Sequence, residues 1–277
     1  MRRFKQVDVF TDTPYQGNPV AVVLDADGLD TATMQRFTDW TNLSEATFLL
    51  PPTRGDADYR LRIFCPGREL PFAGHPTLGS CHAWLEAGGR PRGRDIVQEC
   101  DAGLIRIRRD GARLAFAAPP RLRSGPLPEA DVERLARGLG IRRGEVVAHA
   151  WCDNGPPWQA VLLRSADRAL SLQPDRQALD GSFVGVVAPQ PSGAECDFEV
   201  RAFFPGQAGL VEDPVTGSLN AALGQWLIEA GLAPARYVAS QGTALGRAGR
   251  IHVERDAAGE TWIGGASTTC IDGRVTL

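Results

Sequence analysis

The sequence predicts an α+β protein of two similar lobes related by a pseudo-twofold axis. The same order of strand, break and helix occurs twice, at residues 59–89 and again from residue 198. In both places the helix is small or apolar around most of its circumference, which is typical of a helix buried on all sides. The proline- and arginine-rich stretch Pro119–Pro128 predicts the boundary. We therefore expect an N-terminal lobe of residues 1–120 and a C-terminal lobe of residues 121–277, whose last strand can return to the first lobe.

The individual elements follow from periodicity and from turn-forming residues. Thr31–Thr41 places Met34, Phe37 and Trp40 three residues apart, which predicts a helix. Alternation and apolar runs bounded by proline or glycine predict strands. The expected strands are two within Phe4–Leu24, then Ala46–Leu50, Tyr59–Phe64, Leu104–Ile107, Leu114–Phe116 and Phe198–Gly206. A short amphipathic helix is expected at Asp131–Gly138.

The two halves can also be aligned residue by residue. Tyr59–Gly67 parallels Phe198–Gly206, and His75–Leu85 matches Asp213–Leu223 at proline, glycine, serine, alanine and leucine positions. The two registers differ by one residue, so we expect a one-residue slip between strand and helix. Chance identity between low-complexity helices is the alternative to an internal duplication. A duplicated lobe would form a cleft that receives the N-terminus of each helix.

Composition excludes several classes of function. The chain has 277 residues and a formal net charge of −3, which argues against a general nucleic-acid binder. No apolar run approaches the ~20 residues that span a bilayer, and the N-terminus lacks the apolar core of a signal peptide, so we expect a cytoplasmic protein. Lys5 is the only lysine, so a lysine Schiff base would have to use it. The six cysteines and four histidines lack ligand spacings, so no metal site is expected.

Two helix starts are candidates for ligand binding. A helix N-terminus offers unpaired N–H groups and a positive dipole end. Glycines in Gly74-His75-Pro76-Thr77 and Gly217-Ser218 would let a ligand approach the backbone closely. Two such ends suit a small anion such as a carboxylate. The alternative is a pair of ordinary capped helices in the core.

Three side chains are candidates for acid and base chemistry. Glu45 lies between a turn and an apolar strand, where a carboxylate that points inward would be desolvated and its pKa raised. The alternative is a solvated residue at a strand start. Asp213 precedes a proline at an expected helix start, so it is either an N-cap or a second acid/base group that faces Glu45 or His75. His75 is either a catalytic or a structural histidine.

Linked motifs resemble the PhzF family of phenazine biosynthesis-like proteins. They occur in family order over nearly the whole chain: Phe10 with Gly17–Val22, Asn42–Phe48, Glu69–Thr77, Glu212–Ser218, and Gln241-Gly242 followed by Gly246–Ile251. The resemblance implies the diaminopimelate-epimerase-like fold, in which each lobe is a curved mixed β-sheet or barrel around a central helix. It also implies a homodimer, no cofactor and a small carboxylate-bearing substrate in the cleft.

The resemblance further implies roles for single residues. In the family's characterised enzyme, trans-2,3-dihydro-3-hydroxyanthranilate isomerase, the glutamate that corresponds to Glu45 shuttles a proton between carbons. His75 and Asp213 would polarise or hydrogen-bond the substrate. The expected substrate-binding residues are Asn18, Gly74, Gly217 and Ser218.

Epimerases of this fold use a cysteine at each helix entrance. Gly74 and Asp213 look like the corresponding positions here, so a thiol-pair epimerase or racemase ranks below an acid/base isomerase. A third hypothesis is that the chain is a non-catalytic metabolite-binding protein. Leu219-Asn220 and Cys65 depart from the family pattern, and these positions are expected to shape the pocket.

Overall fold

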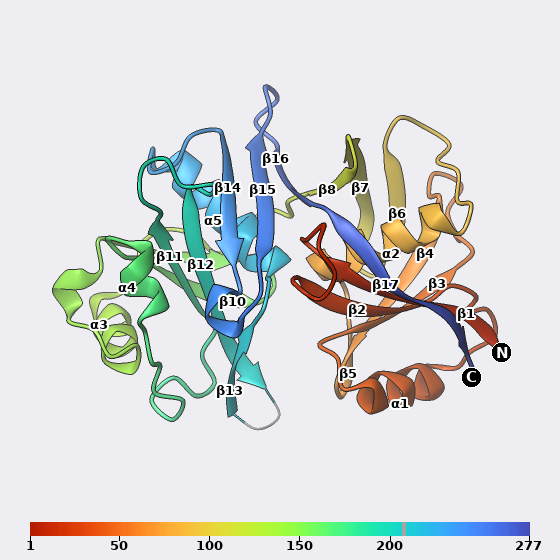
Figure 1. Ribbon diagram of the computed structural model, residues 1–277, viewed down its shortest axis with the longest axis horizontal. Helices are drawn as coiled ribbons and strands as arrows, with labels where there is room; N and C mark the ends of the chain where they lie inside the picture. The colour runs from red at the N-terminus through yellow and green to blue at the C-terminus, as the bar shows by residue number, and fades with distance from the viewer. Residues whose placement is uncertain (207–208) are drawn as a thin grey trace. The chain divides into compact units, whose positions relative to one another are not determined.

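The computed structural model describes residues 1–206 and 209–277 and divides into two compact units. Unit 1 comprises Met1–Ala117 and Gly264–Leu277, and unit 2 comprises Ala118–Ile263. Figure 1 follows the chain from its N-terminus to its C-terminus by colour. In sequence, unit 2 is therefore inserted between two parts of unit 1.

Unit 1 is a mixed sheet that surrounds a central helix. Its elements are β1 (Arg2–Val9), β2 (Asn18–Val23), α1 (Thr31–Thr41), β3 (Ala46–Leu50), β4 (Tyr59–Cys65), β5 (Arg68–Leu70), α2 (Gly74–Glu86), β6 (Ile96–Cys100), β7 (Gly103–Asp110), β8 (Arg113–Ala117) and β17 (Ser267–Val275). The central helix α2 contacts β1, β2, β3, β4, β8 and β17. From Gly74 to Ala83, all its residues except His82 are buried. The expectation of a helix buried on all sides is confirmed.

The helix α1 covers the other face of the unit 1 sheet. It begins and ends at the residues that the periodicity predicts, and the Asp30 carboxylate caps it by accepting from the Thr33 N–H at 2.7 Å. Phe37 packs edge-on against Phe48, with ring centroids 6.0 Å apart. This outer cluster anchors α1 and therefore fixes where the chain leaves its C-terminal end.

Unit 2 has the same kind of architecture. Its elements are α3 (Glu129–Gly138), the 3₁₀ turn η1 (Arg143–Glu145), β9 (Ala148–Asp153), β10 (Pro157–Leu162), α4 (Ala166–Leu170), β11 (Val184–Pro189), β12 (Phe198–Gly206), β13 (Gly209–Asp213), α5 (Gly217–Glu229), β14 (Arg236–Gln241), the 3₁₀ turn η2 (Thr243–Leu245), β15 (Gly249–Arg255) and the start of β16 (Thr261–Gly265), which continues into unit 1 at Gly264. The helix α5 is buried along most of its length. No helix in the described part of the chain is long and apolar enough to cross a membrane.

The strand pairings of the two units follow one pattern. In unit 1, β2 pairs parallel with β3, β3 antiparallel with β4, and β4 parallel with β6. In unit 2, β10 pairs parallel with β11, β11 antiparallel with β12, and β12 parallel with β14. The central helix follows a short hairpin strand in both units. This agreement confirms an internal duplication and the α+β fold of two similar lobes.

The residue-by-residue match between the two central helices was wrong. The sequence aligned His75 with Asp213, but α2 begins at Gly74 and α5 begins at Gly217, with Thr216 as its N-cap. Asp213 instead ends β13. The reason is that the β12–β13 hairpin has two residue pairs more than the β4–β5 hairpin, rather than a one-residue slip. Small residues in buried helices are so similar that several registers match by chance.

Candidate active site

Glu45 lies in the short connection between α1 and β3. Asn42 caps the C-terminal end of α1 in the left-handed region, with φ of 57°, a conformation that asparagine tolerates better than most residues. The chain then turns directly into β3, and the Glu45 carbonyl accepts from the Ala21 N–H at 3.4 Å. The Glu45 side chain is 16% exposed. The connection therefore keeps this carboxylate largely out of water while part of it stays accessible.

His75 in the first turn of α2 contacts Glu45. Its side chain is 7% exposed, and its Nε2 lies 3.2 Å from Glu45 Oε2. The Asn18 amide nitrogen lies 3.4 Å from His75 Nδ1. An amide N–H₂ can only donate, so Nδ1 accepts and the ring proton is on Nε2. Burial lowers the pKa of His75 to about 3, which agrees with a neutral ring at pH 7.

The first turn of α2 has no side-chain cap from its own N-cap residue. Ala73 is the N-cap and makes no side-chain cap hydrogen bond, and no residue of the first turn is acidic. Gly74 and His75 contribute N–H groups there, whereas Pro76 has none to contribute. The N-terminus of α2, which is the positive end of the helix dipole, therefore lies beside Glu45.

In unit 2, Asp213 lies beside the start of α5. The Thr216 hydroxyl donates to Asp213 Oδ2 at 2.6 Å, so the carboxylate reaches the N-cap although its backbone belongs to β13. Gln241, which is fully buried, donates to the Asp213 carbonyl at 3.1 Å and accepts from the Thr216 N–H at 3.0 Å. Gln241 therefore fixes the connection between β13 and α5.

Ser218 follows Gly217 in the first turn of α5. Its hydroxyl oxygen accepts from the Trp158 indole N–H at 3.1 Å, and its carbonyl accepts from the Asn154 amide at 2.9 Å. Because the Ser218 oxygen is the acceptor in the first of these bonds, its hydroxyl proton can still be donated to a ligand.

Sequence reasoning missed four residues that hold this part of the chain: Asn154, Trp158, Thr216 and Gln241. Thr216 and Gln241 stand within quoted motifs, which was the available signal. Trp158 and Asn154 belong to no motif, and they reach Ser218 across about sixty residues of sequence.

The predicted site residues fall into two groups, each described within its own unit. Unit 1 brings together Asn18, Glu45, Gly74 and His75. Unit 2 brings together Asp213, Gly217 and Ser218. The duplication does not extend to the glutamate: Glu45 precedes β3, and Phe183 precedes the equivalent strand β11. Phe183 instead packs edge-on against Trp158.

The cysteine thiols do not form the pair that an epimerase of this fold would use. Neither helix start contains a cysteine, and burial raises the pKa of Cys81, inside α2, to about 12. Burial likewise raises the pKa of Cys152 to about 12. These thiols remain protonated near pH 7 and pack as small apolar groups.

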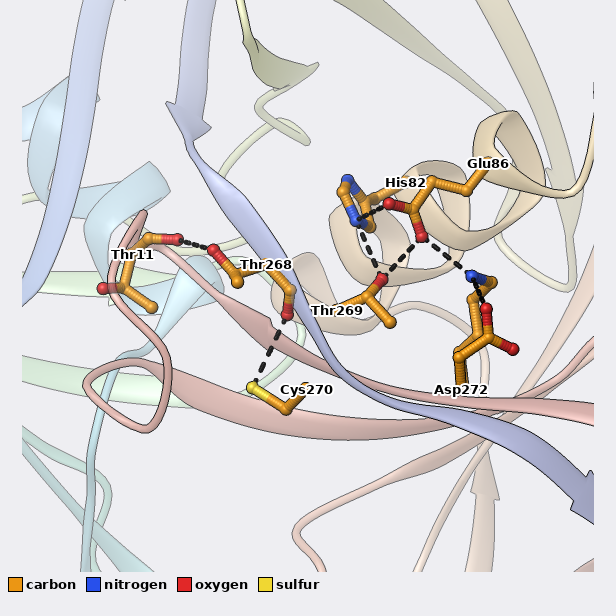
Figure 2. A network of polar contacts seen from close by, with 8 residues as sticks. Thr11, His82, Glu86, Thr268, Thr269, Cys270 and Asp272 are labelled. Carbon is orange, nitrogen blue, oxygen red and sulfur yellow. Dashed lines mark hydrogen bonds and ion pairs between the residues drawn. The ribbon is translucent and has the colours of Figure 1, made fainter.

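A second polar network joins α2 to β17, at the end of α2 remote from His75. Figure 2 shows His82 and Glu86 of α2 beside Thr269 of β17. Thr269 donates to Glu86 Oε2 at 2.6 Å, while His82 Nε2 lies 3.1 Å from the Thr269 hydroxyl and 3.3 Å from Glu86 Oε1. Both partners therefore meet the same ring nitrogen.

Lys5 completes this network from β1. Its buried ammonium contacts Glu86 at 2.9 Å and Asp272 at 2.8 Å. The only lysine of the chain is thus held as a structural cation between three elements, a poor state for Schiff-base chemistry. Within the part of the chain that the structure describes, no group of three His, Cys, Asp or Glu side chains could hold a metal ion.

The buried neutral His75 predicts a pH-dependent stability. Its pKa is about 3 in the folded chain and 6.5 by ordinary value, so between these pH values only the unfolded chain gains the proton. The free energy of unfolding should therefore fall on acidification by about 1.4 kcal/mol per pH unit from this residue. Urea titrations of the wild type and His75→Gln at pH 7 and pH 5 measure how strongly the free energy of unfolding depends on pH. His149 is less deeply buried, so His149→Gln should keep most of the pH dependence of the wild type. A pH dependence in His75→Gln equal to that of the wild type would contradict the prediction.

Comparison with known proteins gives one consistent family. The family model of the phenazine biosynthesis-like proteins matches residues 7–273 of the sequence. Antisense-enhancing sequence 1 of Schizosaccharomyces pombe is 38% identical, over 98% of this chain and 97% of that protein. The trans-2,3-dihydro-3-hydroxyanthranilate isomerase of Pseudomonas aeruginosa is 34% identical, over 94% of this chain and 92% of that enzyme.

A solved structure shows the same fold. The phenazine biosynthesis protein of the PhzF family from Bacillus anthracis superposes with a TM-score of 0.85, covering 100% of this chain and 99% of that one. The sequence identity is 22%, so the likeness concerns the fold.

Proposed function

The chain belongs to the phenazine biosynthesis-like protein family and is an isomerase, and we propose that it moves a proton within a small carboxylate-bearing metabolite. In this proposal its own side chains act as acid and base, with no cofactor. The observation that carries the proposal is the contact between a shielded carboxylate, Glu45, and a neutral imidazole, His75. A carboxylate that is largely removed from water is a suitable general base.

The proton transfer runs through Glu45. Ionised Glu45 accepts a proton from one carbon of the substrate and returns it to another, so the double bond migrates and the molecular formula does not change. The His75 ring packs against Glu45, with Nε2 3.2 Å from Oε2, and so limits the positions that the carboxylate can take between the two steps. Asn18 holds the imidazole in this tautomer from its other nitrogen.

The unit 2 group supports a substrate that carries a carboxylate. The first turn of α5 combines backbone N–H groups, the positive dipole end and the Ser218 hydroxyl, all of which favour an anionic oxygen. Gly217 has no side chain to block a close approach. Asp213 supplies an acceptor for a substrate amino or hydroxyl group, or a second acid/base group. Gly74 offers the corresponding backbone approach in unit 1.

The test uses trans-2,3-dihydro-3-hydroxyanthranilate, the compound named for the Pseudomonas relative, and a panel of small unsaturated carboxylic acids, in H₂O and in D₂O. Migration of a double bond with unchanged composition, followed by absorbance and NMR, is the expected result. Deuterium entering a stereocentre without migration would instead support an epimerase. Saturable binding without any product would support a metabolite-binding protein.

A further inference from the structure

Two arginine–glutamate pairs occupy equivalent places in the two units. Arg62 binds Glu69 with both ends of its guanidinium, at 2.7 and 2.6 Å. Arg201 binds Glu212 in the same bidentate manner, at 2.8 Å for both bonds. Each glutamate lies opposite a phenylalanine across its hairpin, Glu69 opposite Phe64 and Glu212 opposite Phe203. A geometry that recurs after duplication points to a shared role.

Each arginine also ties its hairpin to the helix that covers the outer face. Arg62 donates to the Thr31 hydroxyl in the first turn of α1 at 3.0 Å. Arg201 donates to the carbonyls of Ala169 and Leu172, at the end of α4, both at 3.0 Å. The unit 2 pair is the more deeply buried, with Arg201 6% and Glu212 13% exposed. Each glutamate is therefore held, through its arginine, against the packed covering helix rather than paired at a solvated surface.

The Arg201–Glu212 pair, called the clamp below, determines which face of β13 Asp213 occupies. Successive residues of a strand point to opposite faces, so a slip by one residue exchanges the faces of all its side chains. Glu212 points to the Arg201 face, and Asp213 therefore points to the other face, where the Thr216 hydroxyl donates to it. Glu69 stands in the same way in β5, ahead of the turn that leads to Gly74 and His75.

We propose that Arg201 and Glu212 are positioning residues that hold Asp213 toward the start of α5, and that Arg62 and Glu69 do the same for the turn before His75. Neither pair touches the substrate in this proposal. The inference rests on the proposed function, because it gives Asp213 and His75 their place in the reaction. A planar guanidinium is required, since an ammonium cannot make the two parallel bonds.

Three variants test the unit 2 clamp. Glu212→Gln should lower kcat at least about 10-fold, since small misplacements of catalytic groups are costly. Arg201→Lys keeps the positive charge but loses the two parallel hydrogen bonds of the guanidinium, so its kcat should fall to a similar degree. The double variant Arg201→Met with Glu212→Leu leaves no buried charge unpaired, so it should fold and yet remain impaired. Glu145→Gln, which breaks the more exposed pair with Arg168 in the same unit, is the matched control and should keep wild-type kcat.

An activity-independent readout separates this inference from the proposed function. Amide hydrogen exchange at residues 213–220 should become at least about 10-fold faster in the clamp variants, while residues 224–229 of α5 keep their protection. A folded double variant with wild-type kcat and wild-type exchange would overturn the clamp. If the wild type converts no substrate, the proposed function fails, and the exchange measurement still decides whether the pair positions Asp213.

Discussion

Replacing Glu45 with glutamine is expected to lower kcat by about 10²- to 10⁴-fold, the usual contribution of a positioned proton-transfer group. Glutamine keeps the size of the side chain and its packing against His75, but it removes the negative charge. The amide cannot take up a proton from carbon, so the loss should fall on kcat rather than on KM. Initial rates over a range of substrate concentrations, followed by absorbance, separate the two constants.

Glu99→Gln is the matched control for this experiment. Glu99 is also a shielded carboxylate of unit 1, but it binds the backbone N–H groups of Thr53 and Arg54, at 2.8 and 3.2 Å. Its replacement removes the same charge and should reduce stability without changing kcat. Full turnover by Glu45→Gln would refute the assignment of the base, and an equal loss in Glu99→Gln would show that the effect is not specific to the site.

Replacing Gly79 with valine is expected to lower the free energy of unfolding by about 3 kcal/mol. A Cβ at this position of α2 would lie 2.5 Å from Val20 Cγ1 and 2.9 Å from Val9 Cγ2, so the helix must move away from β1 and β2. For a chain of this size the melting temperature should fall by about 6–12 °C. Scanning calorimetry measures the change.

Gly55→Val provides the comparison for Gly79. A Cβ at Gly55 would meet no atom within 4 Å, and its φ is not in the left-handed region. The same substitution there should shift the melting temperature by no more than about 2 °C. If Gly79→Val melted like the wild type, the close approach of α2 to the sheet would have to be abandoned as a source of stability.

Local patterns in the sequence predicted the elements well. The helix Thr31–Thr41 and the strand Ala46–Leu50 have the bounds that periodicity gave them. Both depend on side chains a few residues apart, which is the range over which a pattern can be read. The all-round apolar character of α2 likewise predicted a helix buried on all sides.

Non-local geometry is what the sequence could not supply. The register between the two central helices was wrong because the hairpin before α5 is longer, and only the pairing of Glu212 with Phe203 reveals the equivalence with Glu69 and Phe64. The contact between Trp158 and Ser218 depends on where β10 lies in the sheet, and no local pattern encodes that place. The family resemblance implied that Glu45 and His75 belong to one site, and the structure gives the distance between them as 3.2 Å.

The pairing of β1 with β17 has a consequence for biosynthesis. β1 is synthesised before unit 2, whereas β17, which pairs with it along Arg2–Val9, is synthesised after unit 2. Unit 2 therefore has all its residues available for folding before that partner exists, and the sheet around α2 keeps one strand position open until β17 has left the ribosome. During synthesis the unit that carries Glu45 is the later of the two to complete its sheet.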